Sequence, residues 1–302
     1  MSARIGQHQH GTEAARSWRL PGGIAVEMPA AVMGVVNATP DSFSDGGRHG
    51  DAQAAIAHGL RLVDQGAAWI DVGGESTRPG SRPVAPDLEI ARVAPVVAAL
   101  AARCPARVAI SVDTMKAAVA RAALDAGARV VNDVSAGADP AMLPLVAERG
   151  CAVVLMHMQG APATMQRAPR YVDVVDEVLA ALDQRIESAL AAGVDEGALL
   201  IDPGIGFGKT PAHNLALLRA LPRFSREFGR PLVVGVSRKS FLPVVAGVDL
   251  AAGERDGLSH IVHALIAREC ALVRAHDVAG ARAALALASA LTGTPADRGG
   301  DV

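Results

Sequence analysis

The sequence predicts a single-domain α/β protein with the (β/α)8 TIM barrel fold. Eight short apolar runs alternate along the chain with longer Ala/Leu-rich stretches of helical period, a pattern typical of repeated βα units around a parallel sheet. The runs are apolar at consecutive positions, as expected of strands that are buried on both faces. A length of 302 residues, half of them hydrophobic (50%), suits one barrel domain.

The eight apolar runs give the expected strands in chain order. They lie at 32–36, 69–72, 108–112, 129–132, 152–156, 199–201, 232–236 and 271–274. Helix start signals stand between them, with Asp51 before the first helix, Asp87 before the second, Asp139-Pro140 before the fourth and Pro211 near the sixth.

A doubly wound open sheet is the competing architecture. It normally carries a GxGxxG phosphate loop after its first strand, but here Asn-Ala-Thr-Pro follows Val36. The Gly-rich segment at 204–209 lacks the GxxxxGK[ST] spacing and follows the sixth strand. These features favour the closed barrel.

The barrel is expected at 29–292, between two peripheral segments. Residues 1–28 are polar and Gly-containing, and 293–302 are rich in Gly, Pro and Asp, so both are predicted to be flexible.

Composition excludes several partner classes. Lys plus Arg total 29 against 31 for Asp plus Glu, so no general attraction to nucleic acid or to an anionic membrane is expected. No apolar run is long enough for a membrane span or a signal sequence. Cys104, Cys151 and Cys270 are far apart and without metal-ligand spacing, which predicts no disulfide framework. We expect a soluble, cytoplasmic protein.

Polar residues follow every expected strand, where the active site of a barrel is built. They are Asn37, 71–78, Asp113, Asn132-Asp133, His157, Asp202, 237–240, and Arg274 with His276. Two of the loops are long and rich in Gly, Ser, Asp and Pro, at 37–47 and 73–83. Phe43 and Pro79 in these loops offer apolar surface to a flat ligand, and such loops can close over a substrate.

These segments carry a family resemblance. The motifs are NATPDSFSDGG at 37–47, IDVGGESTRPG at 70–80, SVDTMK at 111–116, VVNDV at 130–134, LMHMQGAPATMQ at 155–166, DPGIGFGKT at 202–210, GVSRKS at 235–240 and RAHDV at 274–278. With these motifs in this order, the chain resembles the dihydropteroate synthase family over roughly residues 32–291. The resemblance implies condensation of 6-hydroxymethyl-7,8-dihydropterin diphosphate with para-aminobenzoate, giving 7,8-dihydropteroate and diphosphate in folate biosynthesis.

The resemblance also implies a set of pterin contacts. A pterin presents a guanine-like edge with amino and ring N–H donors, which suits carboxylate and amide acceptors. The implied residues are Asp113, Asn132, Asp202, Lys239 and Arg274, with Met156 in the apolar lining. Lys239 can donate to ring acceptors, and the guanidinium of Arg274 can stack on the ring.

The other groups of the two substrates have implied partners as well. Asn37, Arg274 and His276 match the diphosphate positions, and Asn37 would also coordinate Mg2+. The positions implied for para-aminobenzoate are Ser240, Lys239, Phe207, Thr77, Arg78 and Pro79, with Phe43 closing over the ring. Asp113, Lys239, Asn37 and Asp45 form the implied catalytic set, and the expected chemistry is a largely dissociative substitution at the pterin methylene carbon.

Two other functions remain open at this point. A pterin-dependent methyltransferase would share the acidic and Asn contacts, although the SRKS segment and the two long loops disfavour it. A catalytically silent pterin-binding homologue is the second alternative. The resemblance further implies a sulfonamide target and a homodimer through the last helices, for which the Ala/Leu-rich segment 279–291 offers an apolar face. Glu269-Cys270 and Ala275 depart from the family pattern and put the placement of Arg274 in question.

Overall fold

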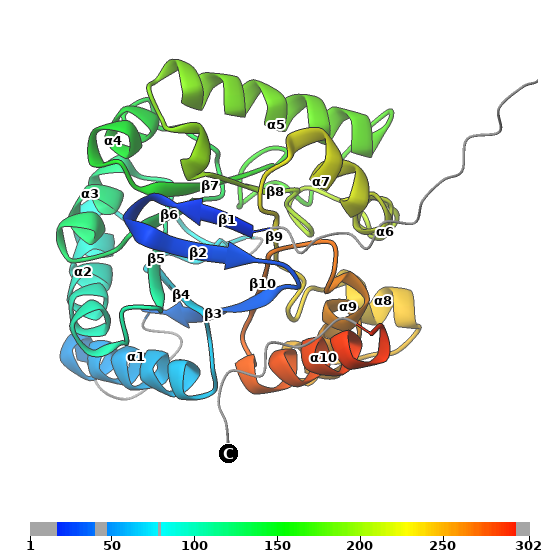
Figure 1. Cartoon of the computed structure of the whole chain (residues 1–302), viewed down its shortest axis with the longest axis horizontal. Coiled ribbons are helices and arrows are strands. Elements are labelled where there is room, and N and C mark those ends of the chain that lie inside the picture. Colours follow the sequence, from blue (N-terminus) through cyan, green and yellow to red (C-terminus); the bar gives the residue numbers. More distant parts are fainter. Residues whose placement is uncertain (1–16, 40–46, 78–79, 294–302) are drawn as a thin grey trace, which may run out of the picture.

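The eight expected strands form a closed parallel barrel (Figure 1). The computed structural model describes residues 17–39, 47–77 and 80–293. Its main sheet has the order β8-β7-β6-β5-β4-β3-β10-β9, and a parallel bridge from Ile201 to Leu232 joins the two ends of that order. The strands are β3 (Ala31–Asn37), β4 (Trp69–Gly73), β5 (Ala109–Asp113), β6 (Val130–Asp133), β7 (Ala152–Met156), β8 (Leu199–Asp202), β9 (Val233–Val234) and β10 (Leu272–Ala275). The TIM barrel prediction is confirmed.

Helices surround the barrel in Figure 1. They are α1 (Gly47–Asp64), α2 (Pro86–Arg103), α3 (Ala117–Asp125), α4 (Met142–Arg149), α5 (Val174–Ala191), α6 (Pro211–Arg219), α7 (Leu221–Phe228), α8 (Phe241–Ala246), α9 (Asp256–Ile266) and α10 (Val278–Leu291), with short 3-10 turns at Pro21–Gly23, Glu196–Ala198 and Ala252–Glu254. Pro211 opens α6 as predicted, whereas α1 begins at Gly47, four residues before the expected signal at Asp51. Among the described helices, none is both long and apolar enough to cross a membrane.

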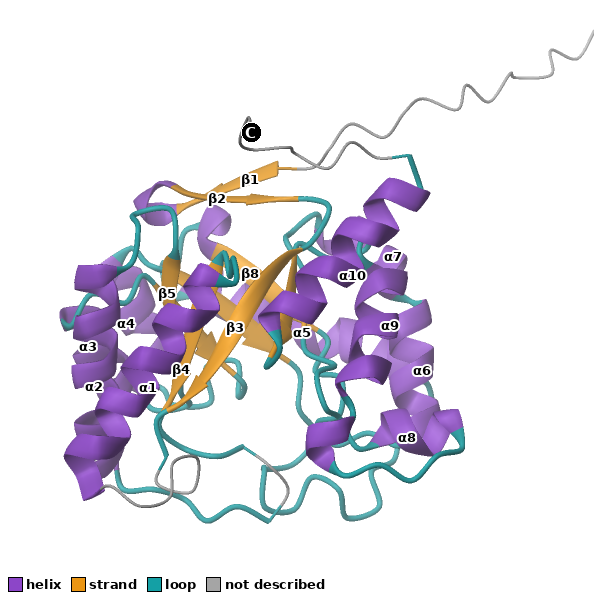
Figure 2. Cartoon of the chain, turned by 90° about the horizontal axis from the view of Figure 1, so that it is seen from below, coloured by secondary structure: helices purple, strands orange, loops and turns teal. Residues whose placement is uncertain are grey.

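An antiparallel hairpin closes the end of the barrel opposite the C-terminal strand ends. It consists of β1 (Ser17–Leu20) and β2 (Ile24–Glu27) and lies across that end in Figure 2. Leu20, Ile24 and Val26 are buried against the inward residues of the barrel floor, including Met33 and Trp69. The hairpin therefore adds a small apolar core to the larger one between barrel and helices.

The hairpin differs from the expected flexible segment 1–28. Each strand has four residues, too few to give a clear alternating pattern among polar neighbours. Burial of one face against the barrel, a tertiary effect, makes these strands stable. The rest of that segment up to residue 16, and 294–302 of the expected C-terminal tail, lie outside the described residues.

Candidate functional site

A cavity of about 730 Å³ opens at the C-terminal ends of the strands. All eight barrel strands or the loops that directly follow them contribute to its lining. Strand register brings part of this set together, since Asn37 pairs with Gly73, Gly73 with Asp113, and Asp113 with Asn132 across neighbouring strands. On the other side of the barrel, Met156 pairs with Asp202.

Eleven of the residues that the sequence singled out line this one cavity. They are Asn37, Thr77, Asp113, Asn132, Met156, Asp202, Phe207, Lys239, Ser240, Arg274 and His276. Four others, Phe43, Asp45, Arg78 and Pro79, lie outside the described residues.

Arg274 is held between two carboxylates inside the barrel. Its Nε donates to Oδ2 of Asp71 at 2.7 Å, and its Nη2 donates to Oδ2 of Asp113, also at 2.7 Å. Oδ2 of Asp71 accepts a further hydrogen bond from the amide nitrogen of Asn132 at 3.0 Å. Charge-assisted bonds of this length fix the guanidinium strongly. The departures at Glu269-Cys270 and Ala275 therefore leave Arg274 in the cavity.

Asp71 is a site-forming residue that the sequence placed among the polar residues 71–78 at the active-site end of the barrel, without a contact or role of its own. It lies in the middle of β4, and its side chain is fully buried at 0% exposure. A carboxylate inside an otherwise apolar strand was the signal that could have identified it, because buried charges need partners.

Burial changes the proton affinity of Asp113. Desolvation raises the pKa of its carboxyl to about 7, while the guanidinium of Arg274 opposes the rise and the neighbouring Asp71 adds to it. Its second oxygen, Oδ1, is buried and has no hydrogen-bond partner among the described residues. A buried oxygen without a partner is ready to accept a donor from a ligand.

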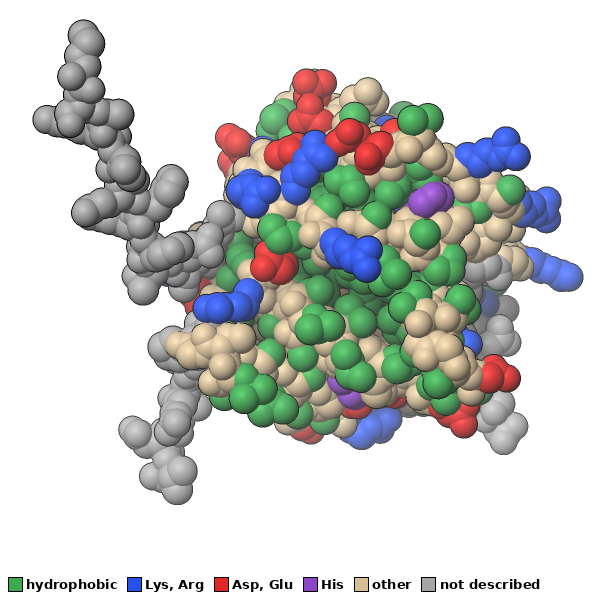
Figure 3. All heavy atoms as spheres, turned by 90° about the vertical axis from the view of Figure 1, so that its right-hand side faces the viewer, with side chains coloured by type: hydrophobic (Ala, Val, Ile, Leu, Met, Phe, Trp, Pro, Cys, Tyr) green, Lys and Arg blue, Asp and Glu red, His purple; other side chains and the backbone are tan. Residues whose placement is uncertain are grey.

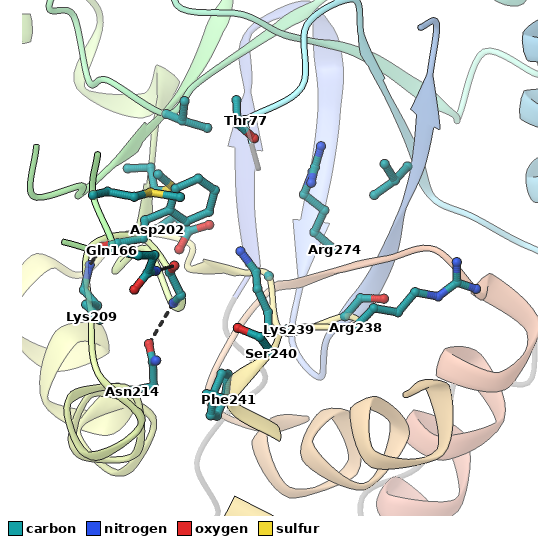
Figure 4. Close-up of a pocket in the computed structure, with 18 of the residues that line it drawn as sticks. Thr77, Gln166, Asp202, Lys209, Asn214, Arg238, Lys239, Ser240, Phe241 and Arg274 are labelled. Atoms are coloured by element: carbon teal, nitrogen blue, oxygen red, sulfur yellow. Dashed lines mark hydrogen bonds between the residues drawn. The ribbon is translucent and has the colours of Figure 1, made fainter. Parts of the chain in front are cut away.

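Asp202 and Lys239 face the cavity from the other side. Figure 4 shows Lys239 between Asp202 and Arg274. Oδ1 of Asp202 accepts from the Gly204 backbone N–H at 2.7 Å. Desolvation raises the pKa of Asp202 to about 6, against this hydrogen bond. The same cause lowers the pKa of the Lys239 ammonium to about 8, and Asp202 opposes that shift.

The loop that follows β8 is fastened by side chains at several backbone groups. Gln166 donates to the Gly206 carbonyl at 2.6 Å, Tyr171 to the Gly208 carbonyl at 2.9 Å, and the Gly206 N–H donates to Asn214 at 2.7 Å. The last of these bonds is drawn in Figure 4. The loop presents the ring of Phe207 to the cavity, and the network keeps that ring in place.

Lys209 ends this loop and is a second residue that the sequence analysis did not select. Its buried ammonium donates to the carbonyls of His157 and Phe207 and to Nδ1 of His157, at 3.2, 2.9 and 3.0 Å. Burial lowers the pKa of Lys209 to about 7. The ammonium thus ties the ends of β7 and β8 together. Its place in the GFGKT motif was the available signal.

Gly204 permits this close approach. Its φ is +71°, and a Cβ there would run into the His157 carbonyl oxygen. Only glycine adopts this conformation beside another backbone without strain.

Two further networks frame the cavity. Ser237 Oγ accepts from the His276 backbone N–H at 3.2 Å and lies 3.0 Å from Nδ1 of the same residue. At the root of the loop with Thr77, Lys116 forms ion pairs with Glu75 and Glu89. Arg238 also lines the cavity, and its guanidinium makes two bonds to Asp256, each 2.8 Å long.

The described residues contain no cluster of three or more His, Cys, Asp or Glu side chains suited to a metal ion. Asn37 is the candidate ligand at the cavity. One amide oxygen fits Mg2+, which commonly uses one or two protein oxygens together with water and substrate phosphates.

Comparisons with known proteins agree with this geometry. A family model described as "Pterin binding enzyme" matches residues 33–276. The dihydropteroate synthase of Mycobacterium leprae (strain TN) is 52% identical over 257 residues, or 83% of this chain and 89% of the relative. The solved dihydropteroate synthase of Xanthomonas albilineans with 4-aminobenzoic acid has a TM-score of 0.84 at 44% identity, covering 93% of this chain and 100% of that one. The same organism's enzyme in complex with 7,8-dihydropteroate has a TM-score of 0.81 at 42% identity, with the same coverage.

Proposed function

The chain belongs to the pterin binding enzymes and, within them, to the dihydropteroate synthases, and we propose that the cavity at its barrel mouth carries out their reaction. This transferase activity joins 6-hydroxymethyl-7,8-dihydropterin diphosphate to para-aminobenzoate through a new C–N bond, and diphosphate leaves. An identity of 52% to a relative named as a synthase favours this function over the methyltransferase and the silent homologue.

Oδ1 of Asp113, which has no hydrogen-bond partner in the described part of the chain, carries the proposal. It is a buried acceptor in the cavity, and Asn132 and Asp202 add oxygen acceptors on the same lining. A pterin offers amino and ring N–H donors along one edge, which such a row of acceptors would satisfy. Lys239 supplies the complementary donor for the ring's acceptor atoms.

The proposed mechanism uses charge placement and no side-chain nucleophile. The C–O bond of the pterin methylene breaks, and positive charge spreads over the pterin ring. The carboxylate of Asp113 would stabilise that charge, because a fixed anion in a water-poor site acts strongly on developing charge. The lone pair of the para-aminobenzoate amine then forms the C–N bond, and the nitrogen gives up one proton to the released diphosphate or to solvent.

The diphosphate would lie toward Arg274, His276 and Asn37. Arg274 offers a preoriented guanidinium, and the Ser237 contact orients the ring of His276. Asn37 would hold Mg2+, which supplies positive charge against phosphate oxygens when it is bound. Each of these groups favours the departing anion over the bound ester.

We place para-aminobenzoate between the Phe207 ring and the Ser240 region. Phe207 provides a flat apolar surface, and Lys239 lies over it. Ser240 and Thr77 line the same cavity and would meet the carboxylate end. The family resemblance also implies contacts from Arg78, Pro79 and Phe43, which lie outside the described residues. Sulfonamides, which also carry an aryl amine, are expected to compete here.

The test is diphosphate release by the purified protein with Mg2+. Release that needs both substrates would support the proposal, with each substrate omitted in turn as the control. Pterin binding without release would instead favour a silent binder.

We also propose that the protein works as a cytoplasmic homodimer. Four exposed apolar side chains lie on the two helices α9 and α10: Ile261 (58% exposed), Leu265 (76%), Leu287 (62%) and Leu291 (79%). Figure 3 shows the side of the molecule on the right of Figure 1, where hydrophobic side chains cover much of the surface. An apolar face of this kind is suited to a second copy of the chain. Replacing Leu265 and Leu287 by Glu should give a monomer in light scattering.

The three cysteines, all of them free, fit a reducing compartment such as the cytoplasm.

A further inference from the structure

Asp71 is a buried carboxylate that contacts two of the side chains expected to bind the pterin, Asn132 and Arg274. We propose that Asp71 is a positioning residue: it orients the Asn132 amide so that its oxygen faces the ligand, and it aligns Arg274 beside Asp113. The inference rests on the proposed function, since it concerns the binding of the pterin substrate.

The direction of two hydrogen bonds defines the role of Asp71. Oδ2 of Asp71 faces two nitrogen atoms, Nδ2 of Asn132 at 3.0 Å and Nε of Arg274 at 2.7 Å. An arginine side chain only donates hydrogen bonds, so the shared oxygen acts as an acceptor toward both. The amide nitrogen of Asn132 is thereby occupied within the barrel wall.

The bond to Asp71 determines which atom of the Asn132 amide a ligand can contact. With its nitrogen bonded to Asp71, the atom it presents to the cavity that it lines is Oδ1, an acceptor. An asparagine amide could otherwise present either its oxygen or its nitrogen. Asp71 thus orients the Asn132 amide so that its oxygen can accept a hydrogen bond from the N–H donors along the pterin edge.

The second effect of Asp71 passes through Arg274. The guanidinium spans Asp71 and Asp113, and its Nη2 bonds to Oδ2 of Asp113, whose Oδ1 has no partner among the residues that the structure describes. One carboxylate therefore holds two ligand-facing groups that come from β6 and β10. Asp71 itself has no exposed surface, so it acts through these two residues.

A swap of donor and acceptor tests the orienting role. Asp71→Asn and Asn132→Asp are made singly and together, and KM is measured for each substrate. Each single change should raise KM for the pterin diphosphate on the order of tenfold and change KM for para-aminobenzoate less than about twofold. In the double variant, the amide introduced on β4 must rotate about its last side-chain bond, because Oδ2 of Asp71 makes both contacts alone. After that rotation its nitrogen can donate to the carboxylate introduced on β6 while its oxygen accepts from Arg274. Pterin KM should then return to within about threefold of the wild type.

Asp133→Asn is the matched control. Asp133 is equally buried and lies on β6, the strand that also carries Asn132, but among the described residues its oxygens accept from Ser135 and Gly137 and from no cavity side chain. Asp133→Asn should lower the free energy of unfolding, and any change in KM should be similar for the pterin diphosphate and for para-aminobenzoate.

The outcomes distinguish the two proposals. A wild-type protein without activity would contradict the proposed function. An active wild type with unchanged pterin KM in Asp71→Asn, or a swap no better than the single changes, would overturn the role of Asp71. If Asp71→Asn does not fold, Asn132→Asp and the swap still decide the matter, because only a direct pairing predicts recovery in the swap.

Discussion

The ammonium of Lys239 lies 4.0 Å from the centroid of the Phe207 ring. This cation–π contact joins the loop after β8 to the loop after β9, and it orients both side chains beside the proposed aminobenzoate site.

Replacing Phe207 by Leu should therefore weaken aminobenzoate binding. The change removes the ring face but keeps an apolar side chain, so we expect KM for para-aminobenzoate to rise about tenfold, with pterin KM changing less than about threefold. Steady-state kinetics with each substrate varied in turn would measure this. Phe228→Leu, in α7 and away from the cavity lining, is the control, and an equal rise there would contradict the assignment.

Asp202 should make activity and stability respond to pH in opposite directions. Its folded pKa of about 6 lies above the ordinary value of 3.8, so the folded state favours the protonated carboxyl. The stabilising contribution is complete below pH 3.8 and is lost as pH rises to about 6. Asp202→Asn should thus stabilise the free protein at pH 8, on the order of 1–3 kcal/mol.

Ligand binding needs the ionised carboxylate as an acceptor. In the wild type, kcat/KM for the pterin substrate should fall about tenfold per pH unit below about pH 7, where Asp113 takes up a proton. The fall should steepen below about pH 6, where Asp202 is protonated as well, and this steeper part should be absent in Asp202→Asn. Urea unfolding and a pH–rate profile provide the two readouts. A variant that is less stable than the wild type at pH 8 would argue against the shifted pKa.

His263 should limit stability in acid. It is fully buried in α9, neither ring nitrogen has a partner among the described residues, and desolvation lowers its pKa to about 4, with His260 adding to the shift and Asp256 and Asp277 opposing it. The neutral ring is favoured in the folded state, so stability is lost as pH falls below the ordinary value of 6.5. His263→Leu should gain about 2 kcal/mol more at pH 5 than at pH 8 in urea unfolding. An equal gain at both pH values would mean that packing, and not charge, is responsible.

The hairpin should contribute to stability without affecting catalysis. Ile24 is buried against the barrel floor, at the end opposite the cavity. Ile24→Ala should lower the free energy of unfolding by about 2–4 kcal/mol and leave both KM values unchanged. The exposed neighbour Ala25, changed to Ser, serves as the control. A rise in either KM would show that a change at the hairpin end of the barrel alters substrate binding in the cavity at the other end.

Local pattern was sufficient to predict the barrel and most of its cavity. Each strand is a short apolar run followed by a polar residue, and in a closed parallel barrel all such residues reach one rim. Asn37, Asp113, Asp202 and Lys239 could be assigned to the cavity on that basis.

Pairing between distant residues could not be predicted in this way. Asp71 and Arg274 are 203 positions apart, and no local period shows that both side chains point into the barrel. The two hydrogen bonds from the edge of the Arg274 guanidinium to carboxylates could not be foreseen from local pattern, and stacking of its face on the pterin stays a prediction. The hairpin escaped prediction for a similar reason, since its burial depends on a surface that forms elsewhere.

β10 pairs with β3, so the last strand of the barrel joins the first. Arg274 stands at this seam and bonds to carboxylates on β4 and β5. In a nascent chain whose β10 is still inside the ribosome, Asp71 and Asp113 would lack the positive charge of Arg274. Catalytic competence should therefore appear abruptly at the end of synthesis, when the ring is sealed, and activity itself would report that the barrel has closed.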